Sequence, residues 1–331
     1  MIIAVDKFGK AINLFEELPE KENEFYCPAC HSPVYLKNGP VKMAHFAHAS
    51  LKNCKAWSEN ESAQHLGLKK ELYDWFAKSE QVKLEVYLPE LQQTPDLLVN
   101  EKIAIEIQCS SLSLQRLAER TKNYHKHGYK VIWLMGKDLW LKKSLTELQK
   151  NLLYFSENRA FFYWELDLEN KKIRIKFLIH QNLRGKLIHL TEEFSFGQSN
   201  LLDFLRKPYL AQKLLQLEAE VDPLLEGYIR KQLYHSVHKW RERQKKYYQA
   251  GQNLMEMDYN KSYYAPPGLD LLRLPDEKQK SIHFSQITRD LSDYYQDYYQ
   301  HFMENKIEKL YPPRFYAIMK NKGDNKNGKK T

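Results

Sequence analysis

The pattern of apolar positions between residues 58 and 140 predicts an alternating α/β domain. Two amphipathic segments have the spacing of helices, and four short apolar runs have the composition of strands. In chain order the segments are ESAQHLGLKKELYDWFAK, VKLEVYL, PDLLV, IAIEIQC, SLQRLAERTKNYHKHG and KVIWLM. Because the last three run strand, helix, strand, they predict a parallel strand pair joined by a crossover helix.

Polar side chains interrupt the strand IAIEIQC, although its composition indicates burial. Successive side chains of a strand point to opposite faces, so Glu106 and Gln108 share one face and the isoleucines occupy the other. Burying an unpaired carboxylate costs several kcal/mol, so Glu106 requires a compensating partner. A bound cation is one such partner.

The first helical segment carries polar groups on its apolar side. On a helix with about 100° between successive residues, Glu61 and His65 fall on the same arc as the apolar residues. Lys69 lies on the flank of that arc, one turn beyond His65. Since Asp96 begins the strand PDLLV, we expect Glu61, His65, Asp96, Glu106 and Gln108 to face one place.

Converging carboxylates of this kind suit Mg²⁺ or Mn²⁺, which can activate a bound water for phosphodiester hydrolysis. The second helix places Arg116 and Arg120 on adjacent turns, where they would meet a phosphate oxygen or pair with Glu106. Lys69 is a further candidate for contact with a phosphate of a nucleic acid. A structural interpretation is the alternative, in which Glu106 forms a buried ion pair with Arg120 or His65.

A second group of polar residues lies in the N-terminal segment, which lacks long periodic runs and predicts short strands and turns. Three cysteines and two histidines are the candidate ligands: Cys27, Cys30, His45, His48 and Cys54. They compete for the four tetrahedral positions of a structural zinc. We expect the three cysteines and one histidine, with His48 preferred, to bind Zn²⁺. The alternative is that Cys27 and Cys30 are small buried core residues.

Composition narrows the class of protein further. The 331-residue chain is 43% hydrophobic and 13% aromatic, which is typical of a globular protein with two or three domains. Its net charge of +9 favours polyanionic partners. No apolar run approaches the roughly 20 residues that cross a bilayer, and the clustered cysteines suit metal binding in a reducing compartment, so we expect a cytoplasmic protein.

The C-terminal half is less informative. FFYWELDLENKKIRIKFLIH predicts a β-hairpin, and the chain beyond residue 200 is mostly helical in pattern. Segments such as HSVHKWRERQKKYYQ interleave cations with aromatic residues, as surfaces for single-stranded nucleic acid do, but packing in a helical bundle is the preferred interpretation. We therefore expect a zinc module at 1–57, an α/β domain at 58–140, a hairpin and helical region at 141–317 and a disordered basic tail at 318–331.

Several motifs, taken in order, resemble CoiA-type competence proteins: YCPAC, MAHFAH, ESAQH, TPDLLV, IAIEIQCSSLSLQRLAERTKNY and GYKVIWLMG. The Asp after Pro and the strand with Glu-x-Gln also resemble the PD-(D/E)xK nuclease core, which implies a restriction-endonuclease-like α/β fold. The resemblance implies that Asp96, Glu106 and the carbonyl of Ile107 bind the catalytic metal, and that Glu61 acts directly or through water. Gln108 departs from the commonest pattern, which has lysine.

The charge that Gln108 lacks would have to come from Lys69 or His65 on the neighbouring helix. The resemblance implies a DNA-processing protein of natural transformation. In this interpretation it is a Mg²⁺-dependent deoxyribonuclease that acts on single-stranded or branched DNA during uptake or recombination, with recombination proteins as candidate partners. The alternative is an inactive nuclease fold that serves as a DNA-binding or recombination-partner module. Gln108 favours the alternative, whereas the inward carboxylates favour the enzyme.

Overall fold

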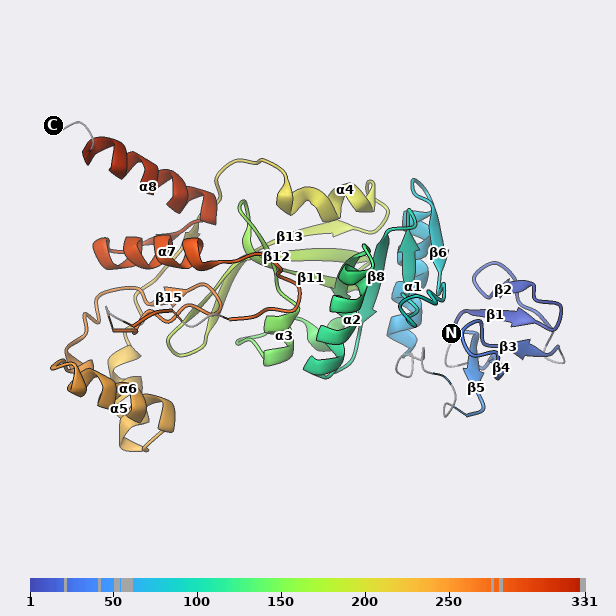
Figure 1. The fold of residues 1–331 in the computed structure, drawn as a ribbon, viewed down its shortest axis with the longest axis horizontal. Coiled ribbons are helices and arrows are strands. Elements are labelled where there is room, and N and C mark those ends of the chain that lie inside the picture. The colour runs from blue at the N-terminus through green and yellow to red at the C-terminus, as the bar shows by residue number, and fades with distance from the viewer. Residues whose placement is uncertain are drawn as a thin grey trace. The chain divides into compact units, whose positions relative to one another are not determined.

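The computed structural model describes residues 1–20, 23–40, 43–50, 54, 62–274, 277–279 and 282–327, with side chains as far as Lys320. The chain divides into two compact units (Figure 1). The first contains residues 1–140, 164–175 and 192–207, and the second contains residues 141–163, 176–191 and 208–331. The predicted boundary at 140 therefore missed two later segments that belong to the first unit. They join it because their strands extend a sheet that begins before residue 140.

A small antiparallel sheet forms the N-terminal module. Its strands are β1 (Ile3–Asp6), β2 (Ala11–Asn13), β3 (Phe25–Tyr26), β4 (Pro33–Lys37) and β5 (His45–His48), in the order β2-β1-β3-β4-β5. Its core is correspondingly small and consists of Ala4, Ile12, Phe25, Cys27, Val34 and Phe46. A core of this size gives little stability unaided, so a further constraint on the module is expected.

The α/β part of the first unit follows the predicted order of elements. These are α1 (Ala63–Phe76), β6 (Val82–Leu84), β7 (Leu97–Val99), β8 (Ile103–Gln108), α2 (Leu114–Lys126) and β9 (Lys130–Met135). The strands β8 and β9 are parallel, with Glu106 opposite Trp133, which confirms the predicted crossover. Helix α1 packs on β8 and α2 on β9. Both helices begin at a serine cap, Ser62 and Ser113, whose side chains accept backbone N–H groups of the first turn.

The predicted hairpin is also present. It consists of β11 (Ala160–Asp167) and β12 (Lys172–Asn182), and β13 (Leu187–Ser195) follows it. The order of this sheet is β13-β12-β11-β9-β8-β7-β6, with β10 (Tyr154–Ser156) paired to β11 and β15 (Tyr264–Ala265) paired to β12. Beside this sheet the first unit has the short helix α4 (Leu201–Arg206).

The second unit is mostly helical towards its C-terminus, as predicted. Its helices are α3 (Glu147–Asn151), α5 (Leu225–Tyr234), α6 (His238–Gln249), α7 (Ser292–Glu304) and α8 (Pro313–Asn327), and β14 (Leu217–Glu218) pairs with β16 (Lys309–Leu310). Four aromatic residues of α7 are core residues: Tyr294, Tyr295, Tyr298 and Phe302. Tyr298, for example, is fully buried and donates a hydrogen bond of 2.6 Å to the carbonyl oxygen of Tyr264.

Helix α8 differs from the expected disordered tail, because it continues from Pro313 to Asn327. Proline in the first helical turn favours this start, and no proline follows to end the helix. Within the described residues, no helix is both long and apolar enough to span a bilayer.

Candidate functional site

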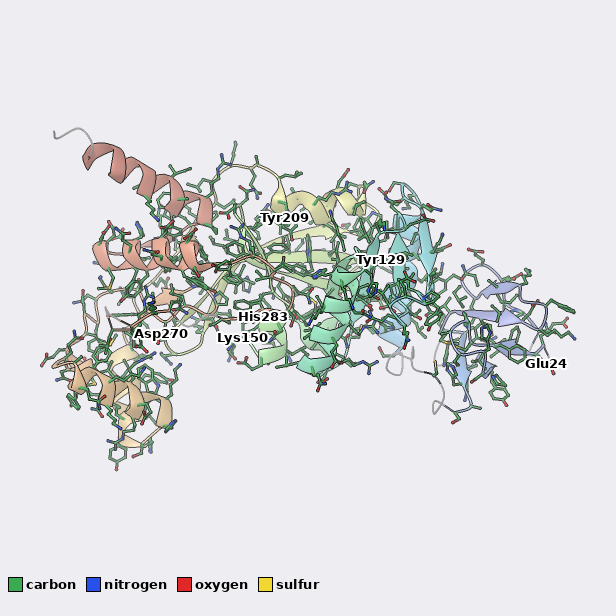
Figure 2. The ribbon with its side chains drawn as sticks, viewed as in Figure 1. Glu24, Tyr129, Lys150, Tyr209, Asp270 and His283 are labelled. Carbon is green, nitrogen blue, oxygen red and sulfur yellow. The ribbon has the colours of Figure 1, made fainter. Side chains whose placement is uncertain are left out.

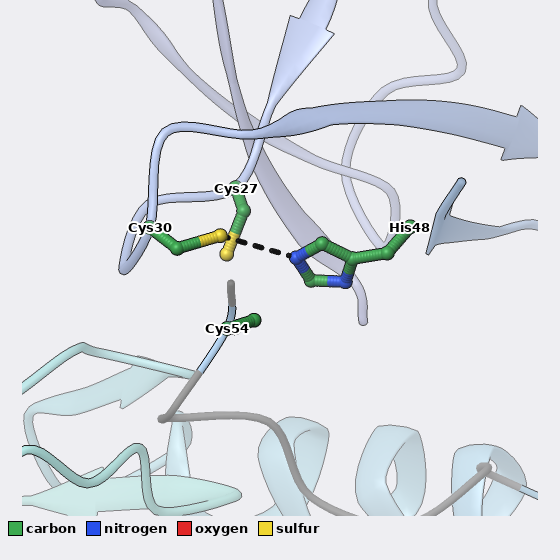
Figure 3. A group of neighbouring side chains, drawn as sticks. All are labelled: Cys27, Cys30, His48 and Cys54. Atoms are coloured by element: carbon green, nitrogen blue, oxygen red, sulfur yellow. Dashed lines mark hydrogen bonds between the residues drawn. The ribbon is translucent and has the colours of Figure 1, made fainter. Parts of the chain in front are cut away.

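Four candidate metal ligands converge in the N-terminal module. The ligand atoms of Cys27, Cys30, His48 and Cys54 lie within 4.8 Å of one another. Figure 3 shows the sulfur atoms of Cys27 and Cys30 directed toward the ring of His48. Cys30 Sγ lies 3.4 Å from His48 Nε2. The structure thus brings together the four preferred candidate ligands, with His48 as the single histidine.

Local backbone structure positions these ligands. Cys27 directly follows β3 and Cys30 lies in the turn before β4, where the N–H of His31 donates to the carbonyl oxygen of Cys27 at 2.9 Å. His31 has a φ of 54°, which closes this turn. His48 ends β5 and stands opposite Val34 of β4. Two cysteines on a tight turn and a histidine on the adjacent hairpin thus supply three of the four ligands that a tetrahedral metal site requires.

The thiols of this cluster influence each other electrostatically. Burial raises the pKa of Cys27, and burial together with the neighbouring thiols raises the pKa of Cys54 to about 12. Burial also opposes ionisation of Cys30, but hydrogen bonds from Ser32 outweigh it and lower the pKa of Cys30. Three crowded thiols without a carboxylate among them suit a soft divalent cation, so the cluster fits Zn²⁺.

The other N-terminal candidates lie elsewhere. His45 Nδ1 lies 2.9 Å from the carbonyl oxygen of Met43, and the structure does not bring His45 into the cluster. His45, one of the five candidate ligands from the sequence, is therefore not part of the cluster. The reason is strand alternation, because His45 is three positions from His48 on β5 and so faces the other side of the strand. Glu61 lies outside the described residues.

Asp96 is the first member of a buried polar centre in the α/β part. Its Oδ2 accepts a hydrogen bond of 2.8 Å from the N–H of Ile107 and lies 3.1 Å from His65 Nε2, while its Oδ1 lies 2.9 Å from Lys69 Nζ. Burial alone would raise the pKa of Asp96. The charges of His65 and Lys69 outweigh that effect and hold the pKa below its usual value. Asp96 is therefore an ionised carboxylate fixed from three sides.

Glu106, the second member, is 5% exposed on β8. Its Oε1 pairs with Arg120 and accepts a hydrogen bond of 2.6 Å from the hydroxyl of Tyr124. Tyr124 packs edge-on against Tyr129, which is labelled in Figure 2. Burial raises the pKa of Glu106, Arg120 opposes that rise, and the charge of Asp96 adds to it. No residue in the described part of the chain donates to Oε2 of Glu106.

The remaining predicted site residues separate into two groups. Gln108 and Arg116 line the same cleft as the carboxylates, and Gln108 Nε2 donates a hydrogen bond of 2.9 Å to the carbonyl oxygen of Ser110. Lys69 and Arg120 are instead bound to carboxylates, and Lys69 is only 1% exposed. Lys69 is thus not placed to contact a phosphate of bound DNA, contrary to that part of the prediction. Of the ion-pair alternatives for Glu106, Arg120 is the observed partner and His65 is not.

The cleft above this centre has a volume of about 260 Å³. It is lined by Ser62, Gln64, His65, Thr94, Asp96, Glu106, Ile107, Gln108, Cys109, Ser110, Leu112, Arg116, Arg120, Trp133 and Asp138. Both carboxylates therefore border one polar space that a hydrated cation or a phosphate could enter.

Two important residues were missed in the sequence. Tyr124 was not singled out, although its position one turn after Arg120 places it on the same side of the helix. Glu85 was not singled out either, because it lies within VKLEVYL, which was predicted as a single strand. In the structure β6 ends at Leu84, and Glu85 turns inward with a φ of 44° to bind Lys69. Strand periodicity gives no signal for such a reversal.

The chain thus joins a cysteine and histidine module to a mixed α/β domain that has a buried carboxylate cleft. Residues 12–57 match the family model for the N-terminal domain of competence protein CoiA, and residues 61–208 match the model for its nuclease-like domain. Competence protein CoiA of Bacillus subtilis (strain 168) is 35% identical over 151 residues, which are 44% of this chain and 40% of that relative. No solved structure matches the chain.

The chain belongs to the CoiA family of competence proteins. The resemblance that the motifs indicated is thereby confirmed. The aligned residues span less than half of the curated relative.

Proposed function

We propose that this chain is a cytoplasmic DNA-processing protein of natural transformation that hydrolyses phosphodiester bonds in the 260 Å³ cleft. The observation that carries the proposal is the pair of buried carboxylates, Asp96 and Glu106, on the border of that cleft. The nuclease-like family domain and the name of the curated relative support both the reaction and its biological setting.

The donor set fits a hard cation such as Mg²⁺ or Mn²⁺. Asp96, Glu106 Oε2 and the carbonyl oxygen of Ile107 would hold it, because hard cations prefer oxygen ligands and keep part of their water shell. Such a cation would polarise a phosphoryl oxygen and lower the pKa of a bound water. The hairpin of β7 and β8, flanked by α1 and α2, supports the assignment of a PD-(D/E)xK core.

The other residues have distinct roles in this proposal. His65 and the N–H of Ile107 orient the carboxylate of Asp96, and Lys69 supplies the positive charge beside it that the commoner lysine at position 108 would give. Gln108 orients the attacking water through Oε1, since its Nε2 is bound to Ser110. Arg116, at the rim of the cleft, contacts a phosphate oxygen of the substrate.

The substrate in this proposal is DNA, single-stranded or branched. The net charge of +9 favours it, and the second unit contains a basic cleft of about 350 Å³ along α6. Its cationic lining residues are Lys239, Arg243, Lys246, Arg273 and Lys278, against the acidic Glu242, Asp270 and Glu277. A surface with this excess of cations would hold DNA through its phosphates, with a strong dependence on salt.

One observation favours a second candidate function, an inactive nuclease fold that binds DNA or a recombination protein. Lys69 neutralises Asp96 and Arg120 neutralises Glu106, so the centre is electrostatically complete without a metal. Gln108 also lacks the charge of the commoner lysine.

A metal-dependent cleavage assay on labelled single-stranded, duplex and branched DNA separates the two functions. For the enzyme, Glu106→Ala and Asp96→Ala should each lower the cleavage rate at least about 100-fold without weakening DNA binding, because these carboxylates act through the metal on the transition state. Glu101→Ala is the matched control, since Glu101 is an exposed carboxylate in an ion pair with Lys83 of the same unit. Gln108→Lys should keep or raise the rate.

Two results would contradict the enzymatic proposal. Cleavage that persists equally in both alanine variants would belong to a contaminant. Metal-independent DNA binding without cleavage of any substrate would favour the binding module.

A further inference from the structure

A chain of buried polar contacts connects the N-terminal module with Asp96. Glu85 Oε2 accepts hydrogen bonds from the backbone N–H groups of Ile2 and Ile3, at 2.6 and 3.1 Å. Glu85 Oε1 accepts a hydrogen bond of 2.6 Å from Lys69 Nζ, which also lies 2.9 Å from Asp96 Oδ1. The three side chains are 8%, 1% and 9% exposed for Glu85, Lys69 and Asp96, so little water competes for these contacts.

The backbone at Glu85 is strained in a way that preserves this chain. Its φ of 44° lies in the left-handed region, which costs a residue other than glycine about 1 kcal/mol. The N–H of Glu85 donates to the carbonyl oxygen of Asp96 at 3.2 Å. A strained residue persists when its surroundings determine its conformation, and here the amides of the module, Lys69 and Asp96 do so.

The same strands of the module carry the metal cluster. Met1 and Phe46 exchange two backbone hydrogen bonds, of 3.2 and 2.8 Å, and Phe46 lies two residues before His48. Strand β1 pairs with β3 through Val5 and Tyr26, and Cys27 follows directly. The positions of the Ile2 and Ile3 amides are therefore fixed by the strands that carry three of the four cluster ligands.

We propose that Glu85 is a positioning residue that couples the Cys27, Cys30, His48 and Cys54 cluster to the carboxylate centre. The ammonium of Lys69 lies between two carboxylates, so Glu85 takes up part of its charge and leaves Asp96 more negative. Without Glu85 the ammonium would neutralise Asp96 alone and repel a cation in the cleft. Zinc binding in the module and divalent-metal binding at Asp96 thus favour each other, as linkage requires. This inference rests on the proposed metal-dependent function.

Titration calorimetry with Mn²⁺ on the full chain tests the first half of the coupling. Glu85→Ala should weaken Mn²⁺ binding about tenfold, and Glu85→Gln should have a smaller effect because its amide oxygen still accepts a hydrogen bond. In cleavage assays both variants should need more Mn²⁺ for half-maximal rate and recover a near wild-type rate at saturation. Loss of packing alone would not give this pattern. Glu101→Gln is the control and should bind Mn²⁺ as the wild type does.

The second half is tested from the module. Cys30→Ser, which removes a zinc ligand but touches no residue of the cleft, should weaken Mn²⁺ binding in the same direction. The double variant with Cys30→Ser and Glu85→Ala should bind Mn²⁺ only slightly more weakly than either single variant, because both substitutions interrupt the same chain of contacts. Hydrogen exchange on wild-type protein gives a readout that requires no variant. Mn²⁺ should slow exchange of the Ile2 and Ile3 amides, and zinc depletion should speed exchange around Glu85.

The outcomes distinguish this inference from the proposed function. If Mn²⁺ binding depends on Asp96 and Glu106 but not on Glu85 or Cys30, the coupling is overturned and the metal site stands. If Mn²⁺ binding depends on none of the four residues, the metal-dependent function is overturned and the coupling with it. Should a Glu85 variant fail to fold, unchanged exchange at Ile2 and Ile3 on addition of Mn²⁺ to wild-type protein would overturn the coupling.

Discussion

The cysteine and histidine cluster and the carboxylate centre differ in how the charge of their buried acidic side chains is balanced. In the cluster, four ligand atoms lie within 4.8 Å of one another and three of them are thiols that burial and crowding make hard to ionise, apart from Cys30. In the carboxylate centre, each buried acid is met by a cationic side chain of the protein itself. The first site could bind an external cation, whereas in the second the protein itself supplies the positive charge.

This difference indicates how each site should respond to metal. A cation at the cluster would contribute to folding, because the module around it has a small core. A cation at the carboxylates would compete with ammonium and guanidinium groups already in place. It would therefore alter reactivity more than stability.

The largest effect should follow removal of the cluster. Cys27→Ser together with Cys30→Ser should reduce bound zinc from about one per chain to none. The N-terminal module should then unfold, because structural zinc contributes about 10 kcal/mol or more in small modules. Elemental analysis and limited proteolysis measure the two outcomes. Cys109→Ser, outside the cluster, should keep the zinc. A double serine variant that still held stoichiometric zinc would show that these residues are not the ligands.

A smaller effect should follow removal of the protein's own cation from the carboxylate centre. Arg120→Leu leaves Glu106 buried without its charged partner, which should lower the free energy of unfolding by about 3–5 kcal/mol. Mn²⁺ should restore more stability in this variant than in the wild type, because it can replace the guanidinium. Denaturant unfolding with and without Mn²⁺ measures both effects.

Arg243→Leu is the matched control for that experiment. Arg243 pairs with Asp270, whose side chain is 44% exposed, so this change should cost about 1 kcal/mol or less. Equal losses from the two substitutions would show that the Arg120 pair does not compensate for burial of Glu106.

The smallest of the three effects concerns a buried ionisable group that has neither a charged partner nor metal ligands around it. His180 is fully buried, and among the residues that the structure describes its Nε2 has no hydrogen-bond partner. Burial lowers the pKa of His180 to about 4, although its hydrogen bond with the carbonyl oxygen of Leu178 opposes the shift. The unfolded chain, with a histidine pKa of about 6.5, binds a proton that the folded chain does not.

Stability should therefore fall as pH decreases from about 6.5 to 4, by about 3 kcal/mol from this group. His180→Phe should remove that part of the slope in urea unfolding measured at several pH values. His283→Gln, at an exposed histidine labelled in Figure 2, should leave the slope unchanged. An identical slope in His180→Phe would show that burial of this histidine does not affect stability.

Local patterns predicted most of the first unit. Alternation along β8 placed Glu106 and Gln108 on one face, and the turn of Cys27 and Cys30 indicated the metal cluster. Periodicity could not predict partners between elements. His65 was expected near Glu106, but it lies against Asp96. Which carboxylate His65 meets depends on the register between β7 and β8, which periodicity does not give. Nor could periodicity predict Glu85, whose left-handed φ breaks the alternation on which the strand prediction depends.

For a related reason, the sequence did not predict that two segments after residue 140 belong to the first unit. Residues 164–175 and 192–207 read as part of a hairpin and a helix, and nothing in their own composition says which strand they extend. Such pairings depend on contacts between residues far apart in the chain.

The pairing of β11 with β9 has a consequence for biosynthesis. Glu165 pairs with Met135, so β9 gains this neighbour only after thirty further residues have been synthesised. A nascent chain that has left the ribosome only as far as Trp140 would present β9, four of whose six residues are buried in the finished fold, as an open edge. The unit reaches completion at Lys207, next to residue 208, where the match to the nuclease-like domain ends. Until the hairpin has been translated, the open edge of β9 can therefore pair with another chain.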